Sequence, residues 1–174
     1  KAMPPFLADL ANIRLAWDWA VENRDASIFN DISDSIMQAF DLAGLYREAF
    51  QMAEAANQSL ESLPKSAKRE TIIAKGRVMG LAGAFLFRLG EYQQAMDRCE
   101  ASMQTLEKYR PHIAYAHTLV YAGAAQFGLG NMDGVISFWR MAAEEYQAVH
   151  SEWGEMTANS NLAEVFLATG QLAE

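Results

Sequence analysis

Four glycines recur at a nearly constant interval and limit the folds that this chain can adopt. Gly44, Gly90, Gly130 and Gly170 are separated by intervals of about 40 residues, the first slightly longer than the others. An apolar residue occupies the second position after each of them. An interval of this length is typical of repeat proteins, in which each unit is one supersecondary structure that packs on its neighbours. The interval therefore predicts a stack of similar units.

The residues that follow each glycine have the spacing of an α-helix. From Tyr92 to Leu106, apolar or small residues recur at positions i, i+3, i+4 and i+7, and the same series returns in the next unit from Met132 to Tyr146. Residues with this spacing share one face of a helix and do not fit a strand. A second helix is predicted before each glycine, which would close it in a left-handed turn. Each unit is therefore predicted to be a pair of helices.

A very small residue recurs midway along the first helix of the later pairs. Gly83, Gly123 and Ala163 are separated by the same interval as the turn glycines of these units. Where two helices cross closely, a larger side chain would hold their backbones apart, so we interpret these positions as a packing requirement. Cys99 lies on the apolar stripe of a second helix, at the position of Trp139 in the next unit. We expect it to be a packed, unreactive thiol.

The chain is predicted to form one all-α domain. A leading helix is expected within residues 1–24, and helical repeats within 25–174, with units at about 25–63, 66–109, 111–150 and 152–174. The last unit would be incomplete, and we expect the chain to be a piece of a longer protein. Core packing is the expected role of most of the aromatic residues, including Trp17, Trp19, Trp139 and Trp153.

Composition excludes several classes of function. Apolar residues make up 51% of the chain and charged residues 21%, which is enough apolar material for a core. Fourteen basic and 22 acidic residues give a net charge of −8 without any basic block, which argues against direct binding to nucleic acid or to an anionic membrane. The longest apolar run, Val78–Phe87, is half the roughly 20 residues needed to span a bilayer. A single cysteine excludes a disulfide framework and fits a cytoplasmic location.

Residues with catalytic chemistry are few and scattered. No phosphate-binding Gly-x-x-x-x-Gly-Lys-[Ser/Thr] segment occurs. His112 and His117 fall on different faces of a helix, so they do not predict a metal site. Asp31 and Asp34 are one turn apart and are the best candidates for paired acid–base carboxylates, although the positive end of a helix dipole explains them more simply. We expect no catalytic site, no cofactor and no metal.

The remaining acidic residues are interpreted as surface. Glu144 and Glu145 in particular are predicted to form a solvated face of their helix. Stacked helix pairs also leave a concave wall, formed by first-helix residues that packing does not use. These residues are Asp34, Gln38, Asp41, Arg77, Gly80, Ala84, Phe87, Arg88, His117, Val120, Tyr121, Ala124, Phe127, Thr157, Ser160, Asn161 and Glu164.

The wall is the predicted binding surface. It mixes two arginines, a histidine, aromatic rings and amides, a mixture that suits a peptide, a partner helix or a small polar ligand. The residues that we expect to contact such a ligand are Arg77, Phe87, Arg88, His117, Tyr121, Phe127, Asn161 and Glu164.

The units resemble the tetratricopeptide repeat. That family has a small residue midway along the first helix, a Gly-x-Tyr turn, and alanines along the second helix. Gly83, Gly90, Tyr92 and Ala95 match this pattern, and the next unit matches it with substitutions. The interval in this chain exceeds that of the usual tetratricopeptide repeat, so HEAT-like or armadillo-like stacking competes on length. The resemblance implies a right-handed superhelical stack of antiparallel helix pairs, an α-solenoid.

A second resemblance concerns the start of the chain. LANIRLAWDWAVENRD (residues 10–25), followed by Gly-Leu-Tyr-Arg-Glu-Ala at 44–49, looks like the start of the sensor array of STAND-class signalling ATPases, such as the maltose-type and LuxR-type regulators. The specific part ends with this second segment, and the remainder is generic repeat. This resemblance implies a sensor segment in a multidomain transcriptional regulator, with a nucleotide-binding domain in the same polypeptide.

The function expected from these patterns is recognition without catalysis. A ligand or protein partner would occupy the concave wall and bias the curvature of the array. The alternative is a free-standing scaffold that assembles proteins, and a hydrolase or transferase using Asp31 and Asp34 is the enzymatic rival. Self-association through the apolar face of the last, incomplete unit is also expected.

Overall fold

The chain folds into α-helices connected by short turns. The computed structural model describes residues 5–61 and 67–169, with side chains from residue 9 onward, and no strand occurs in those ranges. The described part contains eight α-helices and one short 3₁₀ helix: α1 (Pro5–Asn23), α2 (Ala26–Ala43), α3 (Tyr46–Ser59), α4 (Arg69–Arg88), α5 (Tyr92–Leu106), η1 (Glu107–Tyr109), α6 (Ile113–Gly128), α7 (Met132–Ala148) and α8 (Glu152–Thr169). The predicted all-α class is confirmed.

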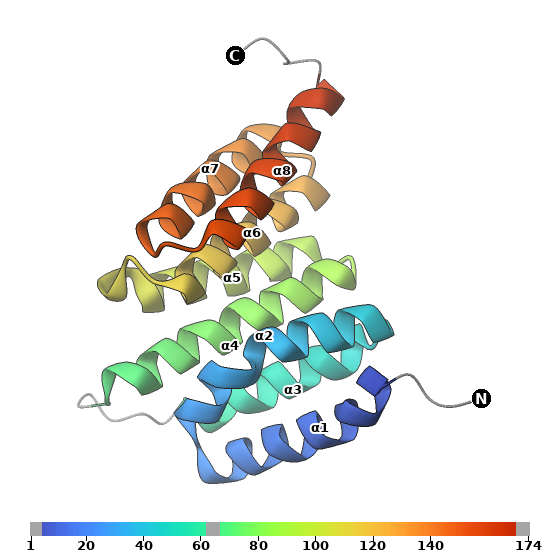
Figure 1. The fold of residues 1–174 in the computed structure, drawn as a ribbon, viewed down its shortest axis with the longest axis vertical. Helices are drawn as coiled ribbons and strands as arrows, with labels where there is room; N and C mark the ends of the chain where they lie inside the picture. The colour runs from blue at the N-terminus through green and yellow to red at the C-terminus, as the bar shows by residue number, and fades with distance from the viewer. Residues whose placement is uncertain (1–4, 62–66, 170–174) are drawn as a thin grey trace.

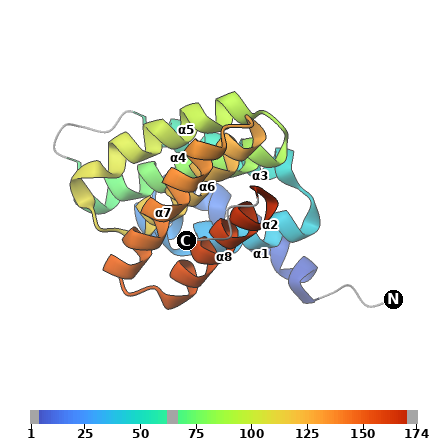
Figure 2. The same ribbon diagram turned by 90° about the horizontal axis from the view of Figure 1, so that it is seen from above.

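Helices that are neighbours in sequence are mostly neighbours in space. The closest packing joins α4 to α5 and α6 to α7, and α3, α5 and α7 each also contact the helix that follows. The order of the chain therefore runs along the long axis of the molecule, from α1 to α8 (Figure 1). Helices α2 and α8 lie on the same side of this stack, opposite α5 (Figure 2).

The same turn closes the first helix of each described pair. Gly44, Gly90 and Gly130 have φ values of 67°, 81° and 76°, in the left-handed region that glycine adopts without strain. After each glycine, the next backbone N–H donates to the carbonyl five residues earlier, at 3.0 Å in all three turns. This pattern is a Schellman-type helix end. The predicted left-handed turns are confirmed at these positions, whereas Gly170 lies outside the described residues.

Small residues allow the paired helices to approach closely. A Cβ atom added at Gly83 would lie 2.7 Å from the sulfur of Cys99, and one added at Gly123 would overlap the indole of Trp139. Cys99 and Trp139 are equivalent residues of successive units. The same position of the second helix therefore packs on the glycine in both units, with a thiol in one and an indole in the other. Ala163, the third member of the series, is exposed on α8.

Two of the tryptophans are not in the core. Trp17 is fully buried, and its Nε1 donates to the carbonyl of Met52 at 2.8 Å. Trp19 is 50% exposed because two residues rotate a helix by about 200°, so the two side chains point to opposite faces. Trp153 is 67% exposed, in the first turn of α8. The prediction of core packing is therefore wrong for Trp19 and Trp153.

The exposed apolar residues of α8 form the face on which we expect self-association. Trp153, Met156 and Leu167 are all more than half exposed. The association itself stays a prediction. Among the described residues, no helix combines the length and apolarity that crossing a bilayer requires.

Substitution of Gly123 tests the close contact between paired helices. Gly123→Val should destabilise the fold by about 2 kcal/mol, because the added methyl groups would displace the Trp139 indole. Ala163→Val is the matched control at the equivalent position of α8, and should cost no more than about 0.5 kcal/mol, the difference in helix propensity. Urea denaturation measures both. Equal destabilisation by the two substitutions would contradict the packing interpretation.

Candidate functional site

A cavity of about 460 Å³ is lined by residues of α2, α4, α6, α7 and α8. We call it the groove. Its apolar lining comes from five helices and consists mainly of Met37, Ala84, Phe87, Val120, Ala124, Phe127, Trp139, Val165 and Ala168. Its polar lining is limited to Arg88, Tyr121, Asn161 and Glu164. An apolar hollow with few polar groups is the usual form of a small-molecule site.

The structure gathers most of the predicted binding residues at this groove. Six of the eight line it directly: Phe87, Arg88, Tyr121, Phe127, Asn161 and Glu164. The other two, Arg77 and His117, lie around a much smaller hollow that shares Tyr121 with the groove. That these side chains contact a ligand stays a prediction.

The groove follows from the repeat and from the position of α8. Phe87 and Phe127 are equivalent residues of successive units, as are Ala84 and Ala124, so α4 and α6 present the same sequence of small and aromatic side chains. Helix α8 packs on α7 and has no comparable contact with α6. The space between α6 and α8 therefore remains open, with Trp139 of α7 at its base. The indole is fixed there because its Nε1 donates to the carbonyl of Val120 at 3.1 Å.

Arg88 is bound to a carboxylate of the neighbouring unit. Its Nε and Nη2 donate to the two carboxylate oxygens of Asp41 on α2, at 2.7 and 3.0 Å. A paired contact of this kind fixes both the position and the orientation of a guanidinium group. The same guanidinium lies 5.5 Å from the centre of the Phe87 ring. Arg88 therefore forms a fixed rim of the groove, with its charge compensated.

Asp34 binds the other two predicted residues. Its Oδ1 lies 3.3 Å from Nη1 of Arg77 and 3.2 Å from Nδ1 of His117, so it joins α2 to both α4 and α6. Burial alone would raise the pKa of Asp34, but the hydrogen bond and charge of His117, together with Arg77, lower it below its usual value. Asp31, one turn earlier, is exposed as Asp34 is, but it makes no ion pair within the described residues. The two carboxylates therefore differ in their partners.

Tyr121 offers a polar atom between the two hollows. Its hydroxyl makes no hydrogen bond within the described residues, although the ring lines both hollows. Burial, with the charge of Asp34, raises the pKa of this phenol, so it stays protonated. The Nε of Arg77 is also buried without a hydrogen-bond partner in the described part of the chain. Both groups are donors that a polar ligand atom or a water molecule would satisfy.

The single cysteine and the metal-ligating residue types do not form a reactive site in the described part of the chain. Cys99 is fully buried, and burial together with the charge of Glu100 raises its pKa to about 12, so its thiol is not ionised at neutral pH. Within residues 9–61 and 67–169, no three His, Cys, Asp or Glu side chains come together as a metal site would require.

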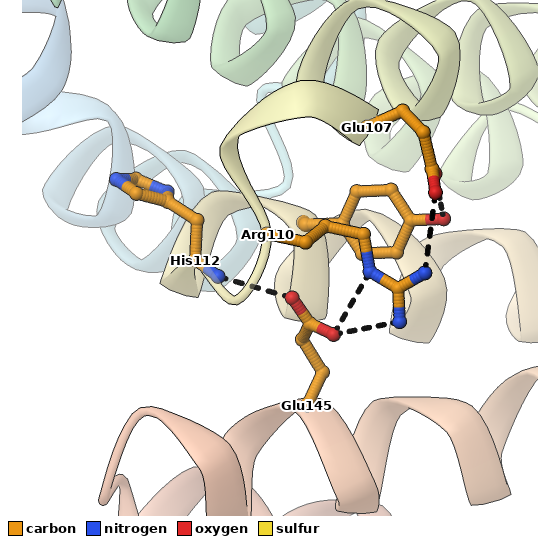
Figure 3. A network of polar contacts seen from close by, with 5 residues as sticks. Glu107, Arg110, His112 and Glu145 are labelled. Atoms are coloured by element: carbon orange, nitrogen blue, oxygen red, sulfur yellow. Dashed lines mark hydrogen bonds and ion pairs between the residues drawn. The ribbon is translucent and has the colours of Figure 1, made fainter.

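A second polar cluster lies at the turn between α5 and α6 (Figure 3). Oε2 of Glu145 accepts from Nε and Nη2 of Arg110 at 3.1 and 2.9 Å, and Oε1 accepts from the backbone N–H of His112 at 3.0 Å. Arg110 also stacks on the ring of Tyr115, at 4.5 Å. The hydroxyl of Tyr115 donates to Glu107 at 3.0 Å. Both oxygens of Glu145 are thus used in joining the turn to α7, and we assign this cluster a structural role.

Glu145 corrects one prediction from the sequence. Glu144 is exposed as expected, but Glu145 is only 4% exposed. A buried carboxylate is tolerated here because three N–H donors and the charge of Arg110 replace its hydration. The hydrogen bond with Glu145 in turn raises the pKa of Arg110. No local pattern marks Glu145 as buried, because the whole of α6 separates it in the chain from its donors, Arg110 and His112.

Comparison with models of known protein families and with curated proteins gives no match for this chain.

The lowered pKa of Asp34 predicts how the stability of the fold depends on pH. Because folding lowers this pKa, the ionised carboxylate stabilises the fold at neutral pH, and the contribution is lost as the pH falls through the folded-state value. Asp34→Asn should therefore cost up to about 1 kcal/mol while the carboxylate is ionised, a modest figure because it is half exposed, and the cost should disappear once the pH falls below the folded-state pKa of Asp34. Urea denaturation over a pH series measures this. Asp31→Asn is the control, and a cost for Asp34→Asn that persists after the carboxylate has been protonated would contradict the assignment.

Removal of the Glu145 carboxylate tests the second cluster. Glu145→Ala should destabilise the fold by about 2 kcal/mol, because it leaves the His112 N–H and the Arg110 guanidinium without their acceptor. Glu144→Ala, one residue earlier and exposed, should be nearly neutral. Thermal or urea denaturation of the two variants gives the comparison. Similar stability of both variants would show that the cluster has no structural role.

Proposed function

We propose that this chain is a non-catalytic recognition module that binds its ligand in the groove. One observation carries the proposal: six residues singled out by their position in the repeat line one cavity of about 460 Å³. Cavities of roughly 300–1,000 Å³ with an apolar lining and a few polar groups are typical of ligand sites. The polar groups of this groove differ in kind, with a guanidinium, a phenol, an amide and a carboxylate, which gives a ligand distinct points of recognition.

The architecture that we propose for the module is a tetratricopeptide-type α-solenoid, with units longer than the usual repeat of that family. Three features support it: the identical left-handed turns, the repeated contact between Gly83 and Cys99 and between Gly123 and Trp139, and the packing of successive helices. In such a stack each unit contacts only its neighbours, so a small change at one contact alters the curvature of the whole.

The biological role that we propose is the sensor segment of a multidomain signalling ATPase or transcriptional regulator. The resemblance of residues 10–25 to the start of such sensor arrays supports this role. A ligand in the groove would contact α6 and α8 together and would favour one angle between them, and a nucleotide-binding domain in the same polypeptide would respond to that shift in population. A cytoplasmic location fits this role.

A free-standing scaffold that assembles other proteins is the alternative. It would use a wide protein surface, since a stable protein interface buries about 800 Å² on each partner. The localised cavity, in which an apolar lining surrounds a few polar groups, favours a ligand-binding module over this alternative.

Filling the groove tests the proposed function. A library of small metabolites is screened by ligand-observed NMR, and hits are located by backbone and indole shifts, which should cluster around Val120, Phe127 and Trp139. Ala124→Phe should abolish binding, because the ring would occupy the space between α6 and α8. Ala55→Phe, at an exposed position of α3, is the control and should leave binding unchanged. The proposal fails if no compound binds, or if hits bind the Ala124→Phe variant with unchanged affinity.

A further inference from the structure

We propose that the groove selects a small apolar molecule with one cationic group, which pairs with Glu164. This inference rests on the function proposed above and specifies the chemistry of the ligand. It follows from three features of the groove: which of its charges are already compensated, what surrounds the remaining charge, and how large the space is.

The positive charges of the groove and of the smaller hollow beside it are already compensated. Arg88 donates two hydrogen bonds to Asp41, and Arg77 lies 3.3 Å from Asp34. An anionic ligand would compete with these carboxylates, which are held in place by α2, and would meet their negative charge as well. The two arginines therefore do not form an anion site.

Glu164 is the remaining charge of the lining. It stands on α8, and no ion-pair partner for it occurs in the described ranges of the chain. Helix α8 contains no lysine or arginine, and Arg140 of the neighbouring α7 lies over the ring of Phe166. The position that holds Glu164 is alanine in the two preceding units, at Ala84 and Ala124. Of these three units, only the last, which begins with α8, therefore has a carboxylate at this position.

The surroundings of Glu164 suit a cation that is attached to an apolar body. Phe87, Phe127 and Trp139 line the same groove, and Phe127 is 51% exposed. The face of an aromatic ring attracts cations, and it also packs against apolar groups. Covering Phe127 would remove apolar area from water, which favours binding. The net charge of −8 adds a weak, long-range attraction for a cation.

The size of the groove favours a small molecule as the occupant. A volume of about 460 Å³ accepts a compound of drug-like size. The polar groups lie within this one hollow, where a compact ligand reaches Glu164 and the Tyr121 hydroxyl at the same time. A folded protein partner would not need its binding groups to converge in this way.

Three probes of similar length and different charge test the inference: phenylbutylamine, phenylbutanol and phenylbutyrate. Their affinities are measured at pH 7 and low ionic strength from the shifts of groove residues in NMR titrations. The amine should bind about fivefold more tightly than the alcohol, as expected for one partly exposed ion pair, and about 0.5 M sodium chloride should reduce the difference. Phenylbutyrate should bind most weakly.

Two variants show whether Glu164 is the source of the preference. Glu164→Gln should reduce the affinity for the amine to that for the alcohol and should leave the affinity for the alcohol unchanged. Glu152→Gln removes a carboxylate from the first turn of the same helix, outside the groove, and should preserve the preference. Loss of the preference in both variants would show that it reflects net charge and would overturn the assignment to Glu164.

The other outcomes separate this inference from the function on which it rests. If the amine and the alcohol bind equally, or if phenylbutyrate binds most tightly, the cationic specificity is wrong and the groove remains a ligand site. If none of the probes shifts groove residues but a compound of the metabolite library does, this inference fails and the proposed function stands; if no compound of either set does, both proposals fail. Acetyl-Phe-Lys-amide presents the same groups on a peptide backbone, and tighter binding of this dipeptide than of the amine would replace the small molecule with a peptide as the occupant.

Discussion

The close approach of two helices within each unit is the contact on which the rest of the structure depends. At Gly83 and Gly123 the backbone of one helix accepts a side chain of its partner without a Cβ atom in between. This contact directs one face of α4 and of α6 toward the second helices, and the left-handed turns fix the distance along the chain at which the partner begins. An adjacent face of each first helix, which includes Phe87 on α4 and Phe127 on α6, lines the groove.

The groove therefore forms where the regular packing of one first helix on the next is interrupted, between α6 and α8. Helices α4 and α6 contact each other and present equivalent alanines and phenylalanines, whereas α8 rests on α7. A fully regular continuation would bring α8 against α6 and close the space over Trp139. The interruption leaves an apolar hollow bounded on one side by a helix that has fewer neighbours in the described part of the chain. A ligand that contacts both α6 and α8 would supply part of the packing that these helices lack with each other.

Much of this fold follows from spacing alone. The interval of the glycines predicts the turns, and the small residues at Gly83 and Gly123 predict the close contacts, because both depend on local backbone geometry and on side-chain volume. Six groove residues were identified from their register in the repeat. The ion pairs of Asp34 and the burial of Glu145 were not predicted, because the residues that bind these two carboxylates come from other units and no sequence spacing encodes such contacts. Trp19 was misplaced because apolar character does not specify which face of a helix a residue occupies.

The ion pairs between units are unevenly distributed along the stack. Helix α2 supplies the carboxylates of Asp34 and Asp41, and α4 supplies the arginines that bind them. These two units are therefore joined by ion pairs along the wall. His117 extends the link to α6 through the same Asp34. No such ion pair within the described ranges joins α6 to α8, and Glu164 lies on α8 beside the open space. The first units are thus joined along the wall by ion pairs, while α8 is held mainly by its packing on α7 in the described part of the chain. A bound ligand that contacts both α6 and α8 can therefore change the position of α8 without breaking an ion pair along the wall.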